Sequence, residues 1–158
     1  MNKKQYWLMK SEASCYSIDD LLHDKKTAWT GVRNYQARNF MRDMQIGDEV
    51  LFYHSNGTTT EPTGVYGIAR VSALAHVDDT QFDPADEHVD PKATHDRPIW
   101  ECVDVQFLKK FQHPVTLSEI KFEPKLAGIM VAQTGSRLSV QPVSEKHFQE
   151  IVKMSEEK

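Results

Sequence analysis

WECVDVQFLKKF, residues 100–111, is the clearest strand pattern in this sequence of 158 residues. Apolar and more polar residues alternate along it, because successive side chains of a strand point to opposite faces. Residues 48–55 instead carry apolar and aromatic side chains on both faces, which predicts a central strand buried on both sides. We expect the two strands to contribute to one shared core through Val50, Phe52, Val103, Val105 and Phe107.

Shorter strands and four helices surround these two strands. Residues 5–10 predict a first strand, 64–74 a hairpin partner for 48–55, and 136–143 a last strand. A helix over Asn34 to Met44 is expected to end at Gly47. The four helices are predicted to begin at capping residues, namely Ser17 with Asp20, Asn34, Thr116 with Glu119, and Ser144.

The order of these elements does not alternate between strand and helix, as it would in a doubly wound sheet. It fits an α+β fold, with a barrel-like, mainly antiparallel β-sheet flanked by short α-helices. Barrel closure would explain why the long strands are apolar on both faces. With 158 residues and no repeat or linker, a single domain over residues 1–158 is the expected organisation.

The composition predicts a soluble globular protein without structural disulfides. Hydrophobic residues make up 39% of the chain and charged residues 27%, which is ordinary for a globular domain. No apolar stretch is long enough for a membrane helix or a signal peptide, so we expect the protein in the cytoplasm. Cys15 and Cys102 lie far apart without a Cys-x-x-Cys pair, which favours two reduced thiols over a disulfide or a zinc site.

The negative charge is concentrated in one part of the chain. Residues 76–104 hold nine acidic and two basic residues, which leaves 17 basic and 14 acidic residues elsewhere, although the net charge is −4. The rest of the chain could therefore hold a nucleic acid locally without coating it indiscriminately. The stretch 76–97 predicts a long acidic loop, which we expect to lie away from any nucleic acid because it would repel phosphate.

Signatures of enzymes and metal sites are missing or weak. The sequence has no Gly-x-Ser-x-Gly, His-Glu-x-x-His or Walker pattern, so no catalytic residue and no cofactor is assigned. His88, Asp90, His95 and Asp96 could in principle hold a divalent ion, but a solvated acidic loop would have the same composition. We expect no metal there.

Residues 29–39 (WTGVRNYQARN) place a Trp before a Gly turn and a helix start. In one interpretation Trp29 belongs to the core and Arg33 to a solvated helix face. In the other, Trp29 offers a ring to a base, Asn34 an amide to the base edge and Arg33 a cation to phosphate. Composition by itself leaves both interpretations open.

Two further segments are candidates for the same site. Tyr53, His54, Ser55 and Asn56 end a strand, where polar groups at a barrel mouth could line a base pocket, or could equally form a core Tyr and a hairpin turn. The Gly turn at 135–137 could bind phosphate through backbone amides, Arg137 and Ser139, or could be an ordinary turn.

Several longer motifs resemble those of the EVE domain, a family of the PUA-like superfamily related to YTH domains. They cover nearly the whole chain, at residues 6–12 (YWLMKSE), 16–21 (YSIDDL), 29–39, 47–48, 50–56 (VLFYHSN), 80–84 (TQFDP), 90–92 (DPK), 103–105 (VDV) and 137–143 (RLSVQPV). The resemblance implies a PUA-like barrel with an aromatic cage for a modified base. The positions that match the YTH pocket residues are Lys10, Ser11 and Trp29.

The sequence departs from the EVE pattern at two positions. Ala13 stands where the family often has Pro, which affects the stiffness of a loop. Thr30 stands where EVE domains commonly carry Asp beside the Trp. A carboxylate accepts a hydrogen bond from the amino group of cytosine, whereas a hydroxyl can donate or accept, so this residue leaves the identity of the base open.

The function expected from these observations is non-catalytic binding of DNA or RNA that carries a modified base, for example a methylated one. Base contacts are assigned to Lys10, Ser11, Trp29, Thr30, Asn34 and residues 53–56, and phosphate contacts to Arg33, Arg137 and Ser139. The alternatives are an enzyme or accessory subunit acting on RNA or a nucleotide, and a module for a small ligand or a protein partner. The last gains support if the pocket borders an acidic surface.

Overall fold

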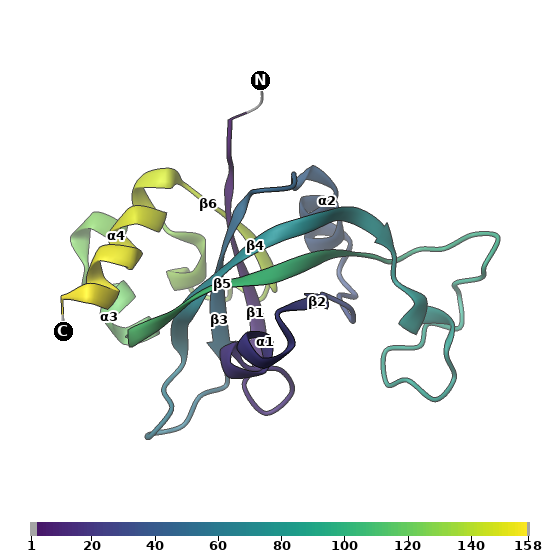
Figure 1. The fold of residues 1–158 in the computed structure, drawn as a ribbon, viewed down its shortest axis with the longest axis horizontal. Coiled ribbons are helices and arrows are strands. Elements are labelled where there is room, and N and C mark those ends of the chain that lie inside the picture. The colour runs from purple at the N-terminus through teal and green to yellow at the C-terminus, as the bar shows by residue number, and fades with distance from the viewer. Residues whose placement is uncertain (1–2, 158) are drawn as a thin grey trace.

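The computed structural model describes residues 3–157 and shows one β-sheet with helices on both faces (Figure 1). Three short 3-10 helices lie at Asp79–Phe82, Pro124–Leu126 and Met130–Ala132. The main elements are β1 (Tyr6–Glu12), α1 (Ile18–Asp24), β2 (Lys26–Ala28), α2 (Tyr35–Asp43), β3 (Glu49–Ser55), β4 (Gly64–Val77), β5 (Glu101–Thr116), α3 (Leu117–Phe122), β6 (Val140–Val143) and α4 (Glu145–Glu156).

The six strands lie in the order β2-β5-β4-β3-β1-β6. Only β1 and β3 run parallel, so the mainly antiparallel α+β fold predicted from the sequence is confirmed. The predicted barrel closure is wrong, because the ladder of described strands ends at β2 and β6. These edge strands have three and four residues, and bulges between the long β4 and β5 curve the sheet without closing it.

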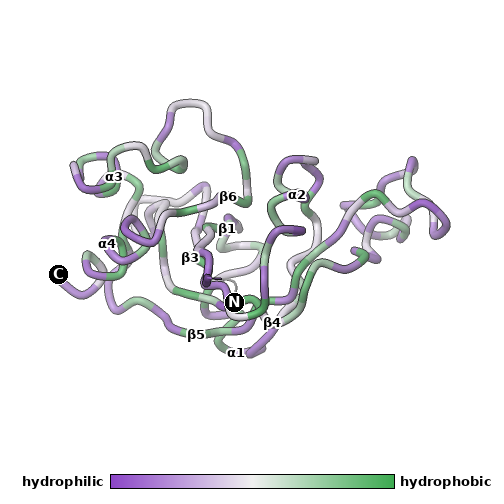
Figure 2. The backbone as a smooth tube through the Cα atoms, turned by 90° about the horizontal axis from the view of Figure 1, so that it is seen from above, coloured by the Kyte–Doolittle hydropathy of each residue, from purple (hydrophilic) through white to green (hydrophobic). Residues whose placement is uncertain are grey.

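Each face of the sheet carries its own core. Trp7 and Met9 of β1 lie under α1 and α2, whereas Leu8 between them faces α3 and α4, because strand side chains alternate. The shared core predicted from the sequence is confirmed on the first face, where four of the five residues are buried and the fifth packs against them: Val50, Phe52, Val103, Val105 and Phe107. Seen from above, α3 and α4 lie at one end of the sheet and α2 near the other (Figure 2).

The four predicted helix caps are confirmed by hydrogen bonds to backbone N–H groups, and two of them form reciprocal capping boxes. Several boundaries differ from the prediction, since β1, β4 and β5 each extend two or more residues further than expected, and two other differences have a visible cause. The helix α2 ends at Asp43, because Met44 is already extended and the N–H of Gly47 bonds to Val71 in β4 instead. The last strand begins at Val140 rather than 136, because the side chain of Gln141 bonds to Ser136 and Leu138 and holds them in a turn.

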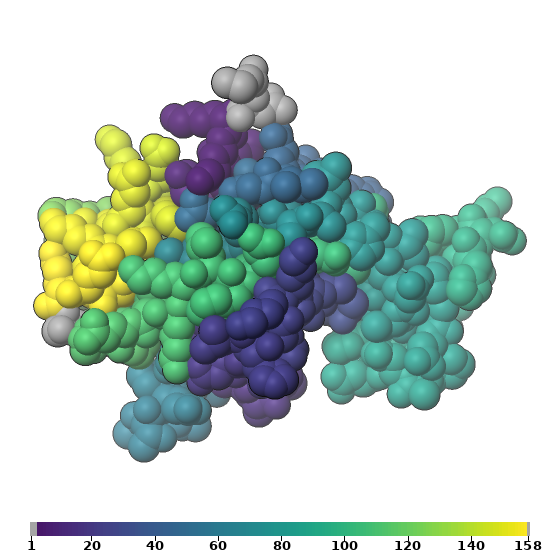
Figure 3. All heavy atoms as spheres, in the orientation of Figure 1, coloured from purple at the N-terminus to yellow at the C-terminus, as the bar shows by residue number. Residues whose placement is uncertain are grey.

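The acidic stretch between β4 and β5 forms a separate lobe at one side of the molecule (Figure 3). Its base is built around Gln81, which is buried and donates to the carbonyls of Asp78 and Trp100. The indole N–H of Trp100 donates to Asp90, 2.7 Å away, and the N–H of Asp90 donates to the carbonyl of Gln81, so the middle of the acidic stretch is tied back to the base of the lobe and the start of β5. Within residues 3–157, no helix is long and apolar enough to cross a membrane.

Candidate functional site

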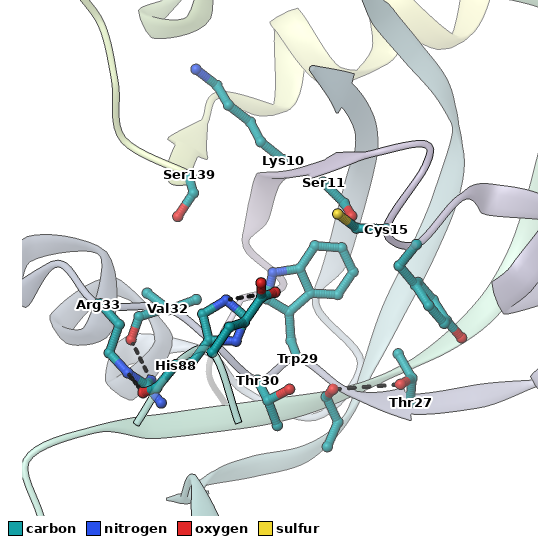
Figure 4. A pocket seen from close by; sticks show the side chains of 14 residues that line it. Lys10, Ser11, Cys15, Thr27, Trp29, Thr30, Val32, Arg33, His88 and Ser139 are labelled. Atoms are coloured by element: carbon teal, nitrogen blue, oxygen red, sulfur yellow. Dashed lines mark hydrogen bonds and ion pairs between the residues drawn. The ribbon is translucent and has the colours of Figure 1, made fainter. Parts of the chain in front are cut away.

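A cavity of about 450 Å³ opens where four separate segments meet (Figure 4). The end of β1, residues 27–33 around Trp29, the acidic loop at Glu87 and His88, and Ser139 before β6 all line it. Its size falls within the range of about 300–1,000 Å³ that is typical of small-molecule sites. Six of the twelve residues assigned from the sequence lie here: Lys10, Ser11, Trp29, Thr30, Arg33 and Ser139.

Trp29 belongs to both the cavity and the core. Its side chain is only 8% exposed, and its ring meets Phe52 edge-on at a centroid distance of 5.3 Å. Its backbone N–H bonds to Val103, which fixes the residue to β5. Among residues 3–157, every buried polar side-chain atom has a hydrogen-bond partner. The indole N–H of Trp29 has no partner among these residues, so it is not buried and is open to the cavity.

Lys10 and Ser11 lie on opposite faces of β1. The Lys10 ammonium lies over the ring of Tyr53, 5.6 Å from its centroid, and its side chain runs away from Trp29 (Figure 4). Burial lowers the pKa of Lys10 below its ordinary value. Ser11 makes one long hydrogen bond of 3.4 Å, and the hydroxyls of Thr30 and Ser139 have no partner among the described residues. These hydroxyls are therefore available to a ligand.

Arg33, to which the sequence assigns phosphate, has a different partner in the structure. Its guanidinium donates to Asp78, Thr80, and the carbonyls of His88 and Val32, and its side chain is 20% exposed. Four of the five N–H groups of an Arg are thereby used. Arg33 thus holds the acidic loop against the segment that carries Trp29.

Asp78 completes this connection from the loop side. Burial would raise its pKa, but hydrogen bonds from Thr80, from the N–H of Gly31 and from Arg33 outweigh burial and lower the pKa. The carboxylate is therefore charged and fully paired at the base of the loop. The sequence assigned no residue of the acidic loop to the site, but this pairing brings Glu87 and His88 into the wall of the cavity. That the loop lies away from the path of a nucleic acid stays a prediction.

Gly31 allows the close approach of the loop. Its φ of +88° is in the left-handed region, and a Cβ at this position would lie 2.9 Å from the ring of His88. The His88 ring in turn makes ion pairs with Asp86 at 3.2 Å and with Glu87 at 3.7 Å when it is protonated. A side chain at position 31 would push this wall outward.

Residues 53–56 lie outside the cavity. Tyr53 points to the second face of the sheet, where burial raises its pKa to about 12. His54 accepts a hydrogen bond from the N–H of Ile18 and stacks on Tyr66 at 4.0 Å. Ser55 is the last residue of β3. The side chain of Asn56, in the turn that follows, donates a hydrogen bond to Glu12 at the end of β1.

Two other assigned residues are also outside the lining. The side chain of Asn34 accepts from the N–H of Ala37 and caps α2. Arg137 is exposed two residues before Ser139 and has no ion-pair partner among residues 3–157. The cap uses the acceptor oxygen of Asn34, whereas the guanidinium of Arg137 is free for an anion.

Sequence reasoning missed five of the polar residues that line the cavity: Cys15, Tyr16, Thr27, Glu87 and His88. Tyr16 was assigned only to the helix start, and its hydroxyl donates to Asp24 while burial raises its pKa to about 12. Nothing in the sequence indicated that Glu87 and His88 line the cavity, because the negative charge of the acidic loop argued against a place near a nucleic acid. No group of three metal-ligating side chains lies together among the described residues.

The curved, mainly antiparallel sheet with helices on both faces, and a cavity between strand ends and loops, defines a class of compact α+β domain with a concave candidate site. Within that class the chain belongs to the EVE domain family, whose model matches residues 5–154. This agrees with the resemblance carried by the sequence motifs.

Relatives are similar over nearly the whole chain. Thymocyte nuclear protein 1 of Homo sapiens is 39% identical, covering 98% of this chain and 76% of that protein. A hypothetical protein from Leishmania major has a solved structure with a TM-score of 0.92 at 48% identity, covering 98% and 96% of the two chains. The structure of human THYN1 in complex with DNA containing 5-methylcytosine has a TM-score of 0.89 at 36% identity, covering 98% and 99%.

Proposed function

We propose that this protein binds DNA that carries a modified base such as 5-methylcytosine, without catalysing a reaction, and that the base enters the cavity beside Trp29. The observation that carries the proposal is that one cavity gathers Lys10, Ser11, Trp29 and Thr30 in a fold shared with a relative solved in complex with such DNA. The proposal extends to this chain what that complex describes for human THYN1.

The chemistry of the cavity supports a base as the ligand. The open indole N–H of Trp29 can donate to a ring nitrogen or carbonyl, and the free hydroxyls of Thr30 and Ser139 can donate or accept. Val32 and Ala28 add apolar surface, against which a methyl group would be removed from water. A flipped or unpaired base needs both kinds of contact.

The charge around the cavity supports a path for the DNA backbone. Lys25 and Lys26 are exposed beside the lining residue Thr27 and have no ion-pair partner among residues 3–157, and the same holds for Arg137 near Ser139. The acidic loop supplies Glu87 and His88 to the lining. We propose that phosphates follow Lys25, Lys26 and Arg137, since the acidic loop repels them.

The proposal is tested by measuring the affinity for oligonucleotides that differ only in one cytosine or 5-methylcytosine, at two salt concentrations. We expect a preference of about ten-fold for the methylated strand, as a buried methyl and well-placed polar contacts provide. Thr30→Val should weaken binding of the methylated strand, whereas Thr60→Val in the distant β3–β4 hairpin should not. Equal affinity for both strands would refute the proposal.

A free modified nucleoside is a second candidate ligand, because the acidic loop borders the cavity. A nucleoside lacks the phosphates that this loop would repel. Titration with 5-methyldeoxycytidine separates the two, since a DNA-binding protein gains affinity from neighbouring phosphates and loses that gain at high salt. Equal affinity for the nucleoside and the oligonucleotide would favour the nucleoside as the ligand. An RNA strand of the same sequence tests whether the protein prefers DNA to RNA.

A further inference from the structure

Glu87 provides the only carboxylate among the residues that line the cavity. The hydroxyls there can donate or accept, and the N–H groups of Arg33 and the Trp29 indole only donate. A carboxylate only accepts when ionised. Glu87 is therefore the one acidic side chain in the lining, and when it is ionised it cannot donate a hydrogen bond to an acceptor atom of a ligand.

The backbone of Glu87 is held firmly although its side chain is 81% exposed. On one side the N–H of His88 donates to Asp86 at 2.7 Å, and the carbonyl of His88 accepts from Arg33 at 2.8 Å. The buried Asp78 anchors the same loop through the N–H of Gly31. The residue is thus presented to the cavity by a fixed turn.

The carboxylate itself is free to accept further hydrogen bonds. Its one partner among the described residues is the His88 ring, whose Nε2 lies 3.7 Å away, beyond ordinary hydrogen-bond length. An ionised carboxylate has about four lone-pair sites, so it can take both hydrogens of an amino group or one of them. Hydrogen bonds within the protein use most of the Arg33 donors, but they leave the Glu87 carboxylate open to a ligand.

Resting on the proposed function, we propose that Glu87 is a specificity-determining residue that selects bases with an exocyclic amino group over bases with a carbonyl at the same position. Cytosine presents an amino donor, which the carboxylate accepts, whereas thymine and uracil present an oxygen, which it repels. The accepted ligand class is therefore 5-methylcytosine rather than thymine, although both carry the same methyl group.

The competing explanation is that Glu87 is one of many acidic residues in the loop and only repels phosphate. In that case its removal would strengthen binding to every oligonucleotide alike. Asp96 supplies the matched control, because it is exposed on the same loop, carries the same charge and does not line the cavity.

Four single-stranded oligonucleotides separate the two contributions, with deoxycytidine, 5-methyldeoxycytidine, deoxyuridine or thymidine at one central position. The methyl contrast tests the proposed function, and the contrast between amino and carbonyl bases tests Glu87. For the wild type we expect the amino bases to bind about ten-fold more tightly than their carbonyl counterparts. Glu87→Gln should remove this contrast, because an amide can accept from an amino group and donate to a carbonyl, and should leave the methyl contrast in place.

Asp96→Asn should leave both contrasts unchanged. The inference about Glu87 is overturned if the wild type has no amino contrast or if Glu87→Gln keeps it. It is also overturned if Glu87→Gln only strengthens the binding of all four strands equally, as a loss of charge would. An amino contrast without a methyl contrast would refute the proposed preference for methylated bases and keep the assignment of Glu87. Because Glu87 is exposed, thermal melts of the variant should match the wild type and exclude misfolding.

Discussion

At the scale of the residue, Trp29 lies both in the core and in the wall of the cavity, two places that the sequence presented as alternatives. Its ring fills the first core beside Phe52, and its N–H is open to the cavity. With an exposure of 8%, Trp29→Ala would remove a buried ring as well as a wall of the cavity. Removing such a buried ring costs about 3–5 kcal/mol of unfolding free energy.

Trp29→Phe separates packing in the core from contact with a ligand. Phe keeps most of the packing but lacks the N–H, so we predict a small loss of stability and about ten-fold weaker binding of the methylated strand. Trp7→Phe is the matched control, because its indole N–H bonds to Asp48 inside the fold. That variant should lose stability without a change in affinity. Wild-type affinity in Trp29→Phe would show that the N–H does not contact the ligand.

A second prediction at this scale concerns Gly31. Gly31→Ala places a Cβ at a positive φ and 2.9 Å from the His88 ring, so the variant should lose roughly 1–2 kcal/mol of stability. The displaced loop should also weaken binding of the modified base. Gly128→Ala is the control, since its φ is +87° but nothing lies within 4 Å of the added Cβ. If both variants bind DNA equally well, the approach of His88 does not matter for the site.

At the scale of the element, a buried ion pair is one of the contacts that hold the acidic loop in place. Arg33 and Asp78 lie 3.0 Å apart and join the loop to the segment that carries Trp29. Removing one partner of a buried pair leaves the other charge without compensation. The loop is therefore a structural wall of the site rather than a solvated appendage.

Asp78→Asn should loosen this loop, with an expected cost of about 3–5 kcal/mol for breaking a buried pair. Hydrogen exchange measures the opening directly, and amides of residues 78–90 should exchange faster while those of β3 stay protected. Asp79→Asn, which removes an exposed neighbouring charge, is the control. Unchanged exchange in the loop would contradict the role of Asp78.

The same carboxylate gives the loop a defined pH dependence. The pKa of Asp78 is lowered in the folded state, so its stabilising contribution is complete above the ordinary pKa of 3.8 and is lost as the pH falls through the lowered value. We predict that the Asp78→Asn variant loses this acid transition of the loop. A loop that opens in the variant and the wild type at the same acidic pH would exclude Asp78 as the cause.

At the scale of the whole molecule, residues of both charges lie close to the lining of the cavity. The acidic loop supplies Glu87 and His88, and the exposed Lys25, Lys26 and Arg137 lie within two positions of the lining residues Thr27 and Ser139. A net charge of −4 does not prevent local binding of DNA under this arrangement, because screening limits the reach of exposed charges to about 8–10 Å.

This arrangement predicts the salt dependence of binding. Arg137→Ala and Lys26→Ala should each weaken binding to methylated and unmethylated strands alike, and each should reduce the slope of log affinity against log salt by about 1. Lys109→Ala is the control, since Lys109 pairs with Glu156 near α4, away from the cavity. If the control changes the slope as much as the two variants, the phosphate path is not where we propose it.

Local structure and much of one core could be predicted from the order of residues in the chain. The caps at Ser17 and Thr116 depend on residues three positions apart, and the alternation in β5 depends on neighbouring residues only. Both can therefore be predicted from the sequence. The family motifs added Lys10, Ser11 and Trp29, which the structure brings to one cavity. These features need no knowledge of distant contacts.

Which residues share the site depends on contacts that form only in the folded chain. The sequence placed no residue of the acidic loop in the site, but the pairing of Asp78 with Arg33, 45 positions away, brings Glu87 to the cavity. Likewise, the register of β3 against β1 sends Tyr53 to the second face and leaves Phe52 under Trp29. Both outcomes depend on contacts between residues far apart in the sequence, whose energies no local pattern records.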